Sequence, residues 1–199
     1  MASREKDTSD PSLQAEAVVG AGRGTLIISM FGTGLLGWGL SAIRVFNGAV
    51  GTAFGLAAVS FWALSMYTIR RGRILRKQYP PVPISTRRAV RKSFLLVVLI
   101  EVIALALVFV FSNQIHRFDL GVDWAAILVG LHYLPLAKTF RAPVLAVLGT
   151  LITLWSLFCW AVFRSDALLI SVVLGTGILL WMASIAALLR ARAIAQSLS

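Results

Sequence analysis

The chain between residues 93 and 111 has the sequence SFLLVVLIEVIALALVFVF, in which Glu101 is the one charged residue among 19. A helix of about 20 apolar residues crosses the hydrocarbon core of a bilayer. Lipid offers no hydrogen-bond partners to backbone N–H and C=O groups, so a single segment that crosses it must be helical. This run therefore predicts a membrane-spanning helix.

Five further apolar runs surround this one, and the composition agrees with them. The chain is 58% apolar and 14% charged, whereas soluble domains have about 45–50% apolar and about 25% charged residues. Asn47-Gly48 is a tight-turn dipeptide, so the first two runs should form a hairpin. The sequence predicts an all-α, polytopic transmembrane bundle of six spanning helices, at about 26–46, 49–69, 93–111, 121–137, 143–163 and 167–189.

The basic residues lie mainly between the apolar runs. If the N-terminal tail is placed inside, 16 of the 19 Lys and Arg residues fall on that side. Only Arg44, Arg117 and Arg164 fall outside. Basic loops are retained in the cytoplasm, so we expect both termini to be cytoplasmic. The net charge of +11 then reflects topology, and no nucleic-acid partner is expected.

The six runs divide the chain into a membrane domain and two tails. Residues 1–24 contain acidic residues and little apolar surface, which is typical of a disordered cytoplasmic tail and not of a signal peptide. Residues 25–192 form the predicted transmembrane domain, and 193–199 a short cytoplasmic tail. Within the domain, the loop 70–92 is expected on the cytoplasmic side.

The loop 70–92 has nine basic residues and no acid, and the sequence YPPVP at 79–83 divides it. Closely spaced prolines stop a helix, so we expect a helix end before them and a new helix after them. Basic clusters beside a membrane span attract anionic phospholipid headgroups. The residues predicted to bind them are Arg70, Arg71, Arg73, Arg76, Lys77, Arg87, Arg88, Arg91 and Lys92.

Glu101 and His132 are the predicted binding residues. At 1.5 Å per residue, Glu101 lies roughly 13 Å below Lys92 and His132 roughly 9 Å from Lys138. The two helices are antiparallel neighbours, so both side chains should lie near the middle of the bilayer. Ionisable groups at that depth are functional candidates. The alternative is a structural role, with a protonated carboxyl bonded to a neighbouring helix and a histidine satisfied in the core.

Pro135 follows closely in the same span. Proline removes a backbone donor and frees the carbonyl four residues earlier, so we predict a helix break at Pro135, beside His132. The segment VGLHYLPLA at 129–137 resembles a motif of an uncharacterised family of small multi-pass bacterial membrane proteins. The resemblance implies a bacterial origin and emphasises His132 and Pro135, but it implies no activity.

The sequence shows no enzyme motif. Cys159 is the only cysteine, which excludes an internal disulfide and a CxxC site. His116, Asp119 and Asp123, taken together as an outer loop, lack a recognised metal-ligand spacing. We therefore expect no catalytic activity, metal or cofactor, and we take Glu101 as the only acidic residue inside a span.

Two functional hypotheses remain. The first is a small permease or channel of the bacterial inner membrane with a polar site at mid-membrane, because transporters place their coupling sites there. The alternative is a non-catalytic accessory or assembly subunit of a larger membrane complex, packed through small residues such as Gly51 and Gly55. The expected partners are the lipid bilayer and either a second copy of the chain or another membrane protein.

Overall fold

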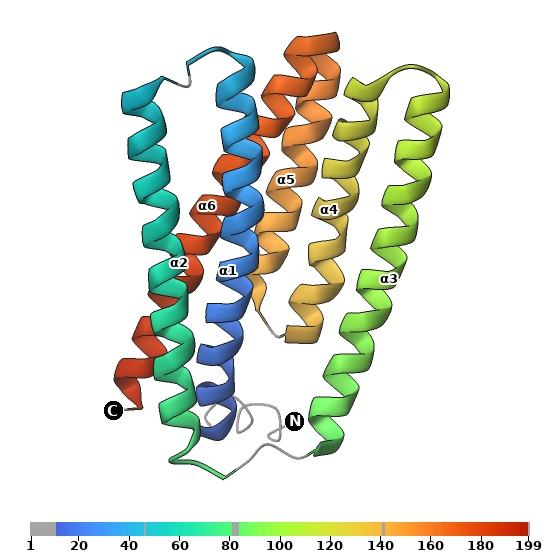
Figure 1. The fold of residues 1–199 in the computed structure, drawn as a ribbon. Coiled ribbons are helices and arrows are strands. Elements are labelled where there is room, and N and C mark those ends of the chain that lie inside the picture. The colour runs from blue at the N-terminus through green and yellow to red at the C-terminus, as the bar shows by residue number, and fades with distance from the viewer. Residues whose placement is uncertain (1–10, 46, 81–83, 141, 199) are drawn as a thin grey trace.

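A computed structural model describes residues 11–45, 47–80, 84–140 and 142–198, with the side chains of 84–87, 89 and 91 left out. Within these ranges the chain forms six helices that run alternately up and down (Figure 1). The first turn of α1 and the last turn of α6 lie at the same end of the bundle. The helices are α1 (Pro11–Ala42), α2 (Gly48–Arg76), α3 (Ile84–Gln114), α4 (Phe118–Phe140), α5 (Pro143–Val162) and α6 (Ser165–Ser197).

All six helices are long and apolar enough to cross a membrane. The prediction of a six-helix transmembrane bundle is therefore confirmed, and the protein is a multi-pass membrane protein. The predicted turn at Asn47-Gly48 joins α1 to α2. Asn47 caps α2 by accepting a hydrogen bond from the Val50 N–H at 3.0 Å. The prolines at 81–83 lie outside the described residues, but α2 ends before them and α3 begins after them.

The helices extend beyond the predicted spans at the end of the bundle where α1 begins and α6 ends. Residues 11–24, expected to belong to a disordered tail, form the first turns of α1, and α6 continues through the expected tail to Ser197. The reason is packing: Ala15 and Val18 of α1 form a buried cluster with Leu75 of α2 and Ala195 of α6. The apolar residues of this segment pack against protein, which the hydropathy of the segment alone did not indicate.

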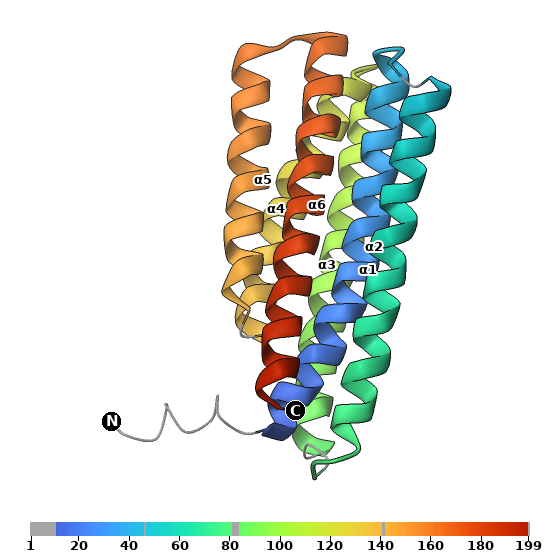
Figure 2. The ribbon, with the colours of Figure 1, turned by 90° about the vertical axis from the view of Figure 1, so that its left-hand side faces the viewer.

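Glycines hold α1, α2 and α6 close together. A Cβ atom on Gly22 would lie 2.8 Å from the Ile69 side chain, and one on Gly177 would lie 2.7 Å from Leu36. Backbones approach this closely in membranes where a small residue replaces a bulky one. Figure 2 shows α6 between α5 and the hairpin of α1 and α2, so α6 joins the two halves of the bundle.

The other half contains the α4–α5 and α3–α4 interfaces. Gly130 of α4 faces Gly149 and Thr153 of α5 so closely that a Cβ on Gly130 would lie 2.8 Å from the Gly149 carbonyl oxygen. By contrast, α3 packs mainly against α4, and most of its apolar side chains, including Leu99 and Leu107, are exposed on the outside of the bundle.

Candidate functional site

Glu101 of α3 and His132 of α4 meet at the middle of their helices. The His132 Nδ1 and Glu101 Oε2 atoms are 2.9 Å apart, and the side chains are 12% and 16% exposed. Ring contacts join the same two helices toward the inner end, between Phe94 and Phe140, and toward the outer end, between Phe109 and Phe118. The structure therefore brings the two predicted residues together, with aromatic contacts on either side of them along the interface.

The contact between these two side chains is close but not linear. Although the 2.9 Å separation is within hydrogen-bonding distance, Nδ1 makes no hydrogen bond of acceptable angle within the described part of the chain. The pair is therefore held by proximity, and by charge when the imidazole carries its second proton. A change in the orientation of either side chain would be needed to form a linear hydrogen bond between them.

His132 contacts the neighbouring Tyr133 ring, and the opposite face of α4 packs against α5. Tyr133 presents its ring at 85° to the imidazole, with the centroids 5.7 Å apart. The close approach of Gly130 to Gly149 holds α4 against α5. The histidine thus projects from a helix that packs closely on α5 toward the peripheral helix α3.

The predicted helix break at Pro135 is wrong. The helix α4 continues through Pro135 to Phe140. The helix therefore tolerates the proline, as membrane helices often do. Thr139 donates a hydrogen bond from Oγ1 to the Pro135 carbonyl at 3.0 Å, which is not the carbonyl that the proline frees. The missing N–H still leaves the Leu131 carbonyl without its usual helical donor, next to His132.

Asp123 corrects a second expectation. It was assigned to an outer loop, whereas it lies in the second turn of α4 and is 1% exposed. Glu101 is therefore not the only acid within a span. The signal was present in the sequence, because Asp123 falls two residues inside the span predicted to begin at Gly121. It also shares a helix face with Ile127 and Gly130, four and seven residues later.

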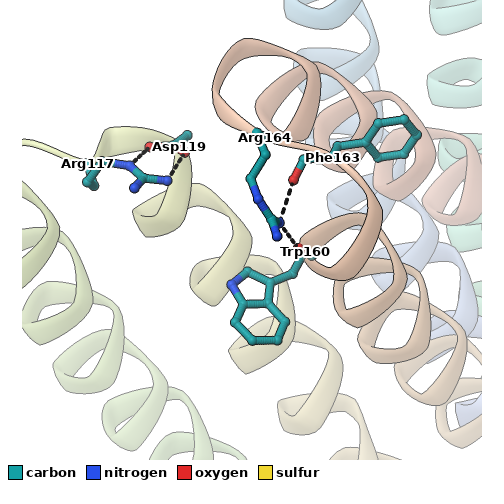
Figure 3. Close-up of polar contacts among 5 residues, drawn as sticks. All are labelled: Arg117, Asp119, Trp160, Phe163 and Arg164. Carbon is teal, nitrogen blue, oxygen red and sulfur yellow. Dashed lines mark hydrogen bonds and ion pairs between the residues drawn. The ribbon is translucent and has the colours of Figure 1, made fainter.

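Arg117 and Arg164 make polar contacts at the end of the bundle where α4 and α6 begin (Figure 3). Arg117 binds Asp119 through two hydrogen bonds, of 3.0 Å from Nε and 2.8 Å from Nη2. This carboxylate raises the pKa of Arg117, which stays charged. Arg164 donates to the carbonyl oxygens of Trp160 and Phe163 at 2.7 and 3.0 Å, at the negative end of the α5 dipole.

The basic segment on either side of the prolines is exposed where it is described. Arg70, Arg73, Lys77, Arg88 and Lys92 are exposed. Two members also contact the protein: Arg76 lies 3.6 Å from a Glu16 carboxylate oxygen, and Arg71 donates to the Tyr67 hydroxyl at 3.3 Å. The side chains of Arg87 and Arg91 lie outside the described residues.

No group of three or more His, Cys, Asp or Glu side chains that could hold a metal ion occurs in the described part of the chain. Cys159 is buried in α5. Comparison with protein-family models, curated proteins and solved structures gave no match. The function is therefore inferred from the geometry of the bundle.

Proposed function

We propose that the protein is a small permease or channel that moves protons, alone or with a solute, past the Glu101–His132 pair. The observation that carries this proposal is the 2.9 Å contact between a carboxylate and an imidazole at mid-membrane. Ionisable groups are rare at that depth and mark ion or proton pathways where they occur. A carboxylate beside an imidazole can accept a proton and pass it on, so the charge crosses the membrane on protein side chains and does not enter lipid.

The peripheral position of α3 supports the same proposal. It packs mainly on α4, whereas α4 also packs closely on α5 through glycine contacts. A movement of α3 relative to α4 would therefore change mainly one interface while it exposes the pair. Pro135 supplies a weak point in α4 one turn from His132.

We place the protein in the bacterial inner membrane with both termini in the cytoplasm. The orientation rests on the 16 basic residues on one side and three on the other. The bacterial origin rests on the motif at 129–137. The exposed arginines and lysines of the 70–92 segment would then bind anionic phospholipids of the inner leaflet.

Proton flux in liposomes tests the proposal. The purified full-length protein is reconstituted with a pH-sensitive dye trapped inside, and a potassium diffusion potential drives proton entry. We expect acidification above that of protein-free liposomes, and its loss in Glu101→Gln and in His132→Ala. His116→Ala and Asp166→Asn, at exposed positions of the outer end, are the matched controls and should retain it. No flux in the unmodified protein, or equal flux in all variants, would contradict the proposal.

A second candidate is an accessory subunit of a larger membrane complex. The observation that favours it is the row of exposed apolar side chains on α3, including Leu99 and Leu107, which a partner helix could cover. Two variants, each with a single introduced cysteine, would test this by crosslinking. One variant carries the cysteine on the exposed face of α3, and the control carries it on the exposed face of α5. A crosslinked band that contains a second protein and forms only from α3 would favour the accessory role.

A further inference from the structure

Asp123 forms the centre of a second polar site, at the outer half of the bundle. Asp123 is 1% exposed, and neither of its carboxyl oxygens has a hydrogen-bond partner within the described residues. Cys159 of α5 lies near enough to interact electrostatically with the carboxylate. Ser156 is also fully buried, and its hydroxyl has no hydrogen-bond partner in the part of the chain that the structure describes. We propose that Asp123 and Ser156 form a proton-binding site between α4 and α5, with Asp123 as the group that binds the proton.

The register of the two helices brings Asp123 and Cys159 to similar levels. Gly130 faces Thr153 in the antiparallel contact of α4 with α5. Asp123 is seven residues, two helical turns, further out on α4 and keeps the same face. Cys159 is six residues further out on α5, and Ser156 is three residues further out. Ser156 therefore lies about one helical turn from the level of Asp123, on the facing helix.

A proton is the ligand that this chemistry fits. An unpaired carboxylate buried away from water is strongly unfavourable, and protonation removes the charge. A metal cation such as Na⁺ or Ca²⁺ needs about six oxygen ligands, whereas Asp123 and Ser156 offer one carboxyl and one hydroxyl beside a soft thiol.

No positive charge offsets Asp123 among the described residues. Asp119, one turn further out on α4, interacts with it but is bound to Arg117. Arg164 is engaged by carbonyl groups at the end of α5. The first turn of α6 carries Asp166, which is exposed, and α3 contributes Ser112, which packs against Gly121. The surroundings therefore favour the neutral form of Asp123.

This site is separate from the Glu101–His132 pair. Asp123 and His132 are nine residues apart on α4, which turns them to opposite faces and separates them by roughly 14 Å along the axis. The inference therefore stands whether or not the mid-membrane pair carries protons.

Infrared spectroscopy of the full-length protein in lipid nanodiscs tests the inference. A protonated carboxyl group has a C=O stretching band distinct from that of a carboxylate. We expect such a band at neutral pH in the unmodified protein and its complete loss in Asp123→Asn. The controls Asp119→Asn and Glu101→Gln should leave it in place. Protein grown with heavy-carbon aspartate should shift the band, which identifies an aspartate even if Asp123→Asn does not fold.

Two outcomes would overturn the proposal. One is the absence of a protonated aspartate band at neutral pH in the labelled protein. The other is a band that falls when sodium replaces an organic cation at constant pH, because the site would then hold a metal cation. Flux measurements on Glu101→Gln are independent of both, so the failure of either proposal can be distinguished.

Discussion

Glu101 and Asp123 are acidic residues of adjacent helices, but their surroundings differ in two respects. Glu101 lies on α3, whose main neighbour is α4, and has a partner, His132, at 2.9 Å. Asp123 lies on α4, at the close interface with α5, and has no hydrogen-bond partner within the described residues. The first acid therefore meets an ionisable group across an interface at the edge of the bundle, whereas the second is isolated inside the bundle. Packing, as well as depth in the membrane, thus determines what each carboxyl group can do.

Both acids contact or lie on α4, and α4 packs on α5 through Gly130. We therefore expect the loss of this contact to change the free energy of unfolding the most. We expect Gly130→Leu to lower the free energy of unfolding by about 3 kcal/mol, because the new side chain meets backbone atoms of α5. Unfolding in mixed micelles of denaturing detergent measures this change. Gly34→Leu is the matched control, since nothing lies within 4 Å of a Cβ there. Equal effects at both positions would show that the α4–α5 contact is not close.

The partnered acid should show energetic coupling. We expect Glu101→Gln and His132→Ala each to lower the free energy of unfolding, and the double variant to lose less than the two single losses combined. The difference should be about 1 kcal/mol, the range of polar contacts between membrane helices. The same detergent unfolding gives the double-mutant cycle. Additive losses would mean that the 2.9 Å contact contributes nothing to stability.

The isolated acid should behave in the opposite way. Asp123→Asn replaces a neutral carboxyl group with a neutral amide of the same shape, so no ion pair is lost. We expect a change in unfolding free energy of less than about 1 kcal/mol. The unfolding midpoint in mixed micelles should therefore match that of the unmodified protein at neutral pH. A large loss would reveal that Asp123 is ionised and bound to a partner, which would remove the contrast with Glu101.

The sequence was sufficient for part of this picture. Six apolar runs predicted six helices, and counting residues from Lys92 and Lys138 placed Glu101 and His132 at similar depth. Depth follows from one helix at a time, because the rise per residue is constant. The predicted span already placed Asp123 inside the membrane, but the burial of its side chain depends on which face of α4 meets α5. That choice is made by close backbone contact at Gly130, which no single-helix pattern contains.

The smallest expected effect lies at the exposed rim above Asp123, where Arg117 binds Asp119. Arg117→Gln removes an ion pair in contact with water, where such pairs contribute little and salt screens them. We expect no measurable change in the unfolding midpoint at high salt and a slight decrease at low salt. The decisive readout is the carboxyl band of Asp123, which should persist in this variant because Arg117 does not neutralise that residue. If the band disappears in Arg117→Gln, the rim and the buried acid are coupled, and Asp123 is not an isolated site.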